Sequence, residues 1–138
     1  LPIVRKPQAA SARRDVQVLR ERPQAIDCER WFHQELIGGD GSVCKMYCVA
    51  DQAFLVEELP TDASAPDSTR GRRQALPMDP RLAEAGLPVG LLTGLEVYGL
   101  DFVGAPDDRV LIDVNPFPSF RCVPRAADAL WDYLEIHS

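Results

Sequence analysis

The sequence lacks the features that mark membrane-spanning and nucleic-acid-binding proteins. No apolar run approaches the roughly 20 residues that a helix needs to cross a bilayer. Basic residues are not in excess, because 15 Lys and Arg stand against 21 Asp and Glu, a formal net charge of −6. With 46% hydrophobic and 26% charged residues, the composition is typical of one globular domain with one core. We therefore expect neither a membrane nor a nucleic acid as a partner.

Residue pairs of the kind that hold zinc are also missing. Cys44 and Cys48 lie four residues apart in an expected strand, but no second pair of Cys or His accompanies them. We interpret these two cysteines, together with Cys28 and Cys122, as small, buried and reduced residues of a cytoplasmic protein.

The hydrophobic pattern predicts alternating strands and helices. The expected helices span residues 79–94 and 124–135. The expected strands span residues 1–6, 15–19, 30–37, 43–50, 52–59, 96–104 and 109–114. This order predicts an α+β fold with a mainly antiparallel sheet and the helices packed on one face.

The two expected helices differ in their local signals. Asp79 is a suitable N-cap and Pro80 a suitable first helical residue. Gly86 and Pro88 predict a kink or a break in the same helix. The second helix is amphipathic, and one stripe carries its apolar residues Ala127, Leu130, Trp131 and Leu134.

Residues 61–78 have no periodicity and are interrupted by prolines, so a long loop is predicted here. The loop contains the densest group of cations in the chain, Arg70, Arg72 and Arg73. Each guanidinium has the geometry for a bidentate contact with phosphate or carboxylate. Two interpretations stay open: a mobile lid that orders over phosphates or an anionic acceptor, and an inert solvated linker.

Three oxygen-bearing side chains form a candidate metal site in the expected hairpin at residues 96–114. Asp113 and Asn115 are two apart in one strand, so both point to the same face. Asp101 lies in the neighbouring strand and is expected near them. Two carboxylates and an amide oxygen are ligands that Mg²⁺ prefers, with water and substrate phosphates completing the shell. The alternative is turn chemistry, because Asp and Asn also cap turns, but the apolar neighbours of Asp101 and Asp113 favour a metal.

Two lysines are candidate phosphate ligands. Lys6 ends the first expected strand and precedes a loop of small residues, where it is placed to neutralise a phosphate. Lys45 lies between Cys44 and Met46 in an apolar strand and is expected on the opposite side from them. There it either meets an anion or reaches solvent from an edge strand.

These motifs, in this order, resemble the ATP-grasp superfamily over nearly the whole chain. The most specific is LIDVNPFPSF, which resembles the acidic-x-Asn magnesium motif, and GLDFVG resembles the strand that supplies another acidic ligand. IVRKP resembles the strand with an ATP-phosphate lysine, and FHQELI resembles the hinge that binds adenine. KMYCVADQAFLVEELP resembles the hairpin whose basic residue approaches the phosphates.

The resemblance implies ATP and Mg²⁺ as cofactors. Asp101, Asp113 and Asn115 would hold magnesium. Lys6 and Lys45 would bind the phosphates, with Lys45, Arg72 and Arg73 as catalytic candidates. The adenine and ribose would be held by the hinge residues Gln34, Glu35, Leu36 and Ile37.

The resemblance leaves three functions open. The first is a ligase that joins a carboxylate to an amine through an acyl phosphate, as ribosomal-protein glutamate ligases do. The second is a kinase of the inositol polyphosphate type, and the third is a non-catalytic nucleotide-binding relative. The third is favoured by the glycine-free loop QAASARR after Lys6 and by Glu57 and Glu58, which stand where many members have a cation.

The resemblance also implies partners. The sequence starts at Leu1, in an expected strand and without a visible signal peptide, which predicts a start inside a larger protein. The chain would then be the carboxy-terminal part of an ATP-grasp domain, and the amino-terminal lobe of the same protein would be its partner. A small carboxylate or phosphorylated acceptor and a second copy in a homodimer are the other partners expected.

Overall fold

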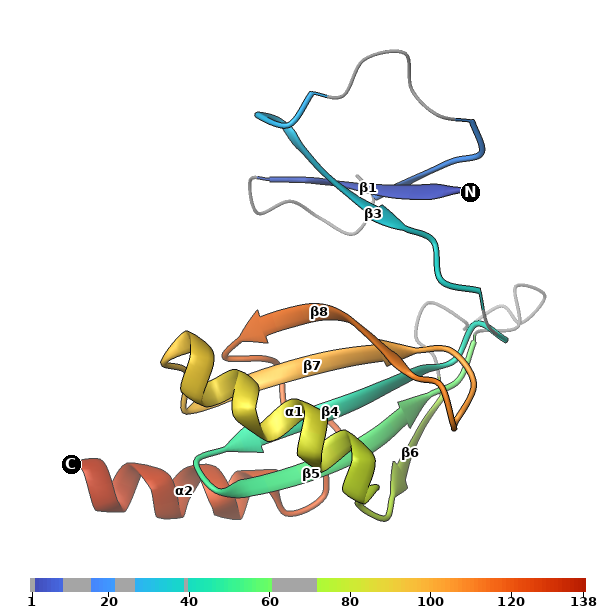
Figure 1. Ribbon diagram of the computed structural model, residues 1–138. Coiled ribbons are helices and arrows are strands. Elements are labelled where there is room, and N and C mark those ends of the chain that lie inside the picture. Colours follow the sequence, from blue (N-terminus) through green and yellow to red (C-terminus); the bar gives the residue numbers. More distant parts are fainter. Residues whose placement is uncertain (1, 9–15, 22–26, 39, 61–71) are drawn as a thin grey trace. The chain divides into compact units, whose positions relative to one another are not determined.

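A computed structural model of the chain describes residues 2–8, 16–21, 27–38, 40–60 and 72–138 (Figure 1). The composition predicts one domain with one core, whereas the chain forms two compact units, Leu1–Ile37 and Gly38–Ser138. The predicted α+β class with antiparallel sheets and two helices is confirmed. No helix in the described part of the chain is long and apolar enough to cross a membrane.

The first unit contains a three-stranded antiparallel sheet of order β2-β1-β3. Its strands are β1 (Ile3–Pro7), β2 (Gln17–Leu19) and β3 (Trp31–Glu35). In the centre of this sheet the Arg5 guanidinium lies 4.5 Å from the centroid of the Trp31 ring and donates to Gln17 Oε1. Lys6 pairs with Phe32 and Val4 with Gln34, so the side chains of Lys6 and Gln34 lie on the same face of the sheet.

The second unit is built on a five-stranded antiparallel sheet of order β6-β5-β4-β7-β8. β4 (Val43–Val49) is the central strand, with β5 (Gln52–Glu58) on one side and β7 (Val97–Val103) on the other. The outer strands are β6 (Arg73–Leu76) and β8 (Val110–Pro116). This sheet positions every residue of the candidate metal site.

Strand β6 corrects the prediction of a loop over residues 61–78. Arg73–Leu76 pair with β5 as a regular antiparallel edge strand. Four residues with no alternation of polar and apolar side chains give no local strand signal, and pairing with β5 decides the conformation. Residues 61–71, including Arg70, lie outside the described part of the chain.

One face of the large sheet packs against α1 (Pro80–Thr93). Met46 and Leu100, both 0% exposed, lie at its centre on neighbouring strands. Gly86 allows the helix to come close, because a Cβ at this position would lie 2.6 Å from Met46 Sδ and 2.8 Å from Leu100 Cδ1. The main hydrophobic core, which includes Cys44, Cys48, Leu82, Tyr98 and Phe102, therefore lies between α1 and this face.

Helix α1 is continuous, so a break at Gly86 and Pro88, one of the two predicted outcomes, is wrong. Its N-cap is as predicted, since the Asp79 side chain accepts a hydrogen bond from Arg81 N at 2.9 Å. Pro88 removes the donor that would bond to the Glu84 carbonyl, but both residues are on the exposed side of the helix, where water can satisfy that carbonyl.

The second helix, α2 (Ala126–His137), packs on the opposite face of the sheet, whereas both helices were expected on one face (Figure 1). Ala126 lies against Tyr47 and Val56, which alternate with the α1-facing residues of their strands. The buried residues of α2 are Ala126 and Ala129. The predicted stripe is therefore largely outward, since Trp131 is 65% and Leu134 58% exposed.

The buried thiols predict a loss of stability at alkaline pH. Burial raises the pKa of Cys44 and of Cys48 from 9.0 to about 11. Between these values the unfolded chain releases the two protons while the folded protein keeps them, so the free energy of unfolding falls as pH rises. We expect a loss of about 1 kcal/mol per thiol between about pH 8 and about pH 10, measured by urea denaturation.

Matched variants separate the thiols from other alkaline effects. Cys48→Ala should remove about half of the thiol contribution to this pH dependence. Cys28 and Cys122 are exposed, so the expectation that all four cysteines are buried is wrong for these two. Cys28→Ser changes one of them and should leave the dependence unaltered. Equal pH dependence in the wild-type and Cys48→Ala proteins would contradict the prediction.

Candidate functional site

The β7–β8 hairpin brings the three predicted metal ligands to one face of the sheet. Asp101 and Asp113 are directly opposite each other as Cα partners, and Asn115 pairs with Gly99 one step along the same face. The residues that alternate with Asp101, Leu100 and Phe102, are buried against α1 on the other face. Burial of these two side chains therefore fixes the direction of Asp101.

A β-bulge at Ile112 places Asp113 and Asn115 on the face that carries Asp101. Phe102 pairs with Leu111, but Asp101 pairs with Asp113, so Ile112 is an extra residue in β8. A regular hairpin would pair Asp101 with Ile112 and turn Asp113 and Asn115 to the opposite face. The sequence carries no sign of this bulge, because a single inserted residue has no pattern of its own.

Lys45 completes the charged group on this face. It lies on the central strand β4, is 7% exposed, and pairs with both Val56 and Asp101. Its Nζ donates to Asp101 Oδ2 at 2.6 Å. The interpretation in which Lys45 meets an anion is confirmed, and the alternative of an edge-strand lysine that reaches solvent is wrong.

The donor set fits a magnesium ion that is bound together with phosphates. In the described part of the chain, no three His, Cys, Asp or Glu side chains gather closely enough to enclose a metal. Two carboxylates and the Asn115 amide on one open face are a partial shell, and Mg²⁺ commonly takes its remaining oxygens from water and substrate phosphates. Asp113 and Asn115 are exposed and therefore accessible to such a ligand.

The connection after β8, which is the end of the LIDVNPFPSF motif, borders the site. Pro118 folds back onto β7, so close that a Cβ at Gly99 would lie 3.0 Å from the Pro118 ring. Phe120 packs on Tyr47, with 5.5 Å between the ring centroids. Phe117 is 72% exposed and has a φ of 54°, a conformation that is unfavourable for a bulky residue. The connection thus covers the sheet beside Asn115.

The two candidate catalytic arginines, Arg72 and Arg73, differ in their contacts. The Arg73 guanidinium contacts Glu58 at 3.0 Å and donates to the carbonyl of Arg121 at 2.8 Å. A phosphate or carboxylate would have to displace these contacts. Arg72 is exposed, and no ion pair of its side chain occurs within the described ranges.

The two glutamates that depart from the family pattern are held by arginines. Glu58 binds Arg73, and Glu57 lies 3.3 Å from the Arg109 guanidinium. Neighbouring residues of a strand point to opposite faces, so the two pairs stabilise opposite sides of the sheet. Both glutamates therefore have a structural explanation in the second unit.

In the first unit, two of the candidate nucleotide ligands, Lys6 and Gln34, lie on the same face of the sheet. Gln34 Oε1 is buried and has no hydrogen-bond partner. A buried acceptor without a donor is costly unless a ligand supplies one. The N–H of Leu36 donates to Pro2 O at 3.0 Å, so an adenine edge would need another donor from the Glu35–Ile37 segment.

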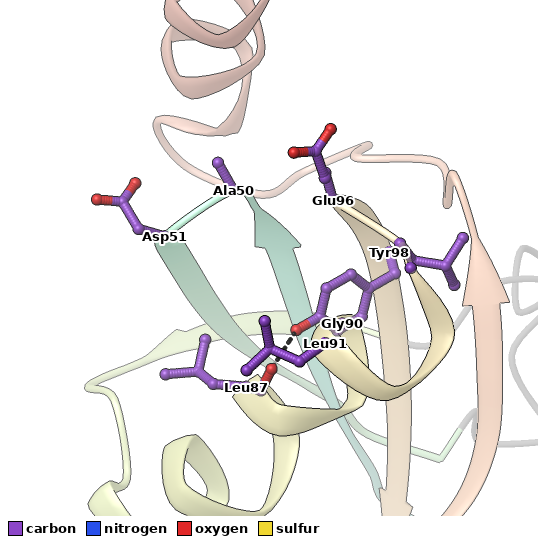
Figure 2. Close-up of a pocket in the computed structure, with 9 residues that line it drawn as sticks. Ala50, Asp51, Leu87, Gly90, Leu91, Glu96 and Tyr98 are labelled. Atoms are coloured by element: carbon purple, nitrogen blue, oxygen red, sulfur yellow. Dashed lines mark hydrogen bonds between the residues drawn. The ribbon is translucent and has the colours of Figure 1, made fainter.

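A hollow of about 670 Å³ lies at the carboxy-terminal end of α1 (Figure 2). It is lined by Leu87, Leu91 and Tyr98, with Asp51 and Glu96 at its edges. The Tyr98 hydroxyl bonds to the carbonyl of Leu87 at 3.1 Å, and burial raises the pKa of Tyr98 to about 12. Tyr98 is therefore a neutral packing residue, and the hollow lies on the α1 face, away from Asp101 and Asp113.

The fold matches part of known ATP-grasp ligases. One is PsnB complexed with a phosphomimetic variant of its minimal precursor, Mg and ADP, with a TM-score of 0.66 and 20% identity over 87% of this chain and 40% of that chain. Another is the D-alanine–D-alanine ligase from Bacillus anthracis, with a TM-score of 0.67 and 15% identity over 99% of this chain and 53% of that chain. At these identities the likeness shows the fold.

Sequence comparison gives no further assignment, since no family model and no curated protein matches the chain. PsnB in complex with the precursor peptide PsnA2 and AMPPNP matches over 96% of this chain and 47% of that one, with a TM-score of 0.64. The chain thus spans about half or less of the ligase chains that it resembles.

Proposed function

We propose that this chain is the ATP- and magnesium-binding part of a ligase that joins a carboxylate to an amine through an acyl phosphate. The observation that carries the proposal is the pairing of Asp101 with Asp113, with Asn115 on the same face, in a fold shared with ATP-grasp ligases. A structure of PsnB contains Mg and ADP. The two carboxylates and the amide oxygen of this chain fit a magnesium ion.

In this proposal the chain's own residues bind and orient the nucleotide. Asp101, Asp113 and Asn115 hold the metal, which when bound neutralises charge on the β- and γ-phosphates. Lys45 supplies a positive charge beside Asp101. On the first unit Lys6 contacts phosphate, and Gln34 with Glu35, Leu36 and Ile37 contacts adenine and ribose. Arg72 is the exposed candidate for the anionic acceptor, and Arg73 joins it only by leaving Glu58.

The test of the metal site is Asp113→Asn. This variant removes one charged ligand from an exposed position, so we expect at least a tenfold loss of Mn²⁺-dependent ADP affinity with the fold intact. Isothermal titration calorimetry with ADP, with and without Mn²⁺, measures the affinity, and thermal melting reports the fold. The melting temperature should stay equal or rise, because one of two neighbouring like charges is removed.

Asp108→Asn is the matched control, since it removes the same charge from the turn of the same hairpin. It should bind ADP and Mn²⁺ as the wild type does. Equal Mn²⁺-dependent affinity in the Asp113→Asn and wild-type proteins would refute the site.

The reaction class has a separate test. An acyl phosphate reacts with hydroxylamine to give a hydroxamate, whereas the phosphate ester made by a kinase does not. We expect hydroxamate formation that depends on ATP, Mg²⁺ and a carboxylate substrate in the complete protein. ADP formation with a polyol phosphate and without hydroxamate would favour the kinase, and nucleotide binding without turnover would favour the non-catalytic relative.

A further inference from the structure

The buried ammonium of Lys45 already contacts one of the proposed metal ligands, the Asp101 carboxylate. Lys45 is 7% exposed, and its Nζ lies 2.6 Å from Asp101 Oδ2. The sheet fixes the position of Lys45, because this residue lies on the central strand and is paired with Val56 on one side and Asp101 on the other. The ammonium is therefore held against the carboxylate rather than free to move into solvent.

The ammonium and a divalent cation compete for this carboxylate. An ammonium at hydrogen-bond distance repels a doubly charged ion that approaches the same oxygen, and the repulsion is large in a partly buried site. Asp113 and Asn115 alone offer one charge and one amide, a weak set for a cation that gives up water reluctantly. Without nucleotide, a divalent cation would therefore approach an Asp101 carboxylate whose charge Lys45 already neutralises.

Nucleotide phosphates change this balance, because they give the ammonium another anion. We infer that Lys45 is an internal counter-ion that keeps the Asp101 carboxylate neutralised until phosphates arrive, so that a divalent cation binds well only together with nucleotide. The inference rests on the proposed function and adds an order of events to it. The Lys45 ammonium leaves Asp101 for the phosphates, and the divalent cation then binds the Asp101 carboxylate. By linkage, the metal and the nucleotide raise each other's affinity by the same factor.

The test measures Mn²⁺ binding to the protein without nucleotide, from the electron paramagnetic resonance signal of free Mn²⁺. Lys45→Met and Lys45→Gln remove the charge, and Gln keeps a donor for Asp101 if the Met variant fails to fold. Both variants should bind Mn²⁺ at least tenfold more tightly than the wild type. Arg81→Met is the control, since it removes the same charge from an exposed pair with Asp107 and should change the affinity less than twofold.

Two further measurements tie the gain to this site. Adding Asp113→Asn to Lys45→Gln should cancel the increase in Mn²⁺ affinity. The factor by which Mn²⁺ raises ADP affinity should fall in Lys45→Gln relative to the wild type. Unchanged Mn²⁺ affinity in both Lys45 variants, with Asp113-dependent binding of ADP and Mn²⁺ retained in the wild type, overturns this inference alone. Loss of that Asp113 dependence overturns the proposed function instead.

Discussion

Replacing Asp101 with leucine should lower the free energy of unfolding by about 2–3 kcal/mol. The variant leaves the ammonium of Lys45, which is 7% exposed, without its anion. Loss of one partner from a buried ion pair costs about 3–5 kcal/mol, and the 28% exposure of the Asp101 side chain lowers the expected value. Urea denaturation followed by circular dichroism measures the change.

A double variant distinguishes the unpaired charge from other effects of the substitution. Lys45→Met combined with Asp101→Leu replaces the pair with apolar side chains and should recover most of the lost stability. Lys45→Met alone should cost less than Asp101→Leu, because Asp101 is the more exposed partner. A double variant no more stable than Asp101→Leu would show that the ion pair is not the cause.

Deletion of Val114 should abolish the metal site. Asp113 and Asn115 then become neighbours in β8, so their side chains point to opposite faces in any register and one of them turns toward the α1 face. We expect Mn²⁺-dependent ADP affinity to fall at least tenfold, as in Asp113→Asn, and stability to fall by about 2 kcal/mol because a polar group moves toward the core. Calorimetry and urea denaturation give the two quantities.

Val114→Ala is the control for this deletion. It keeps the number of residues in β8 and so keeps Asp113 and Asn115 two apart, while it removes apolar contacts of a side chain that is 38% exposed. Stability should fall by about 1 kcal/mol, but the Mn²⁺-dependent affinity should be retained. If the deletion variant bound ADP and Mn²⁺ as tightly as Val114→Ala, the shared face of Asp113 and Asn115 would not position the ligands.

Several elements could be predicted because their causes are local. The strand period of two places Asp113 and Asn115 on one face whatever the strand pairs with. Asp79 followed by Pro80 begins a helix through a hydrogen bond between residues two apart. The hairpins at Asp51 and Pro106 join neighbouring segments of the chain, so their turn residues are sufficient to predict them.

Other features depend on partners that are distant in the sequence. β6 has no strand pattern and exists through pairing with β5. The outward stripe of α2, with Trp131 and Leu134, is apolar like a buried stripe, and only the contact of Ala126 with Tyr47 and Val56 shows which side faces the sheet. Placement of the helices on opposite faces follows from the same contacts.

The sequence by itself therefore determined the α+β class, the hairpins and the three candidate magnesium ligands, because local backbone geometry decides strand period, turns and caps. The tertiary structure alone decided that Lys45 contacts Asp101, since these residues are 56 apart and meet only when β4 pairs with β7. It also decided that Asp113 faces Asp101, since the register of β8 depends on the bulge at Ile112. The physical reason is that packing and strand register, rather than local preference, select which side chains meet.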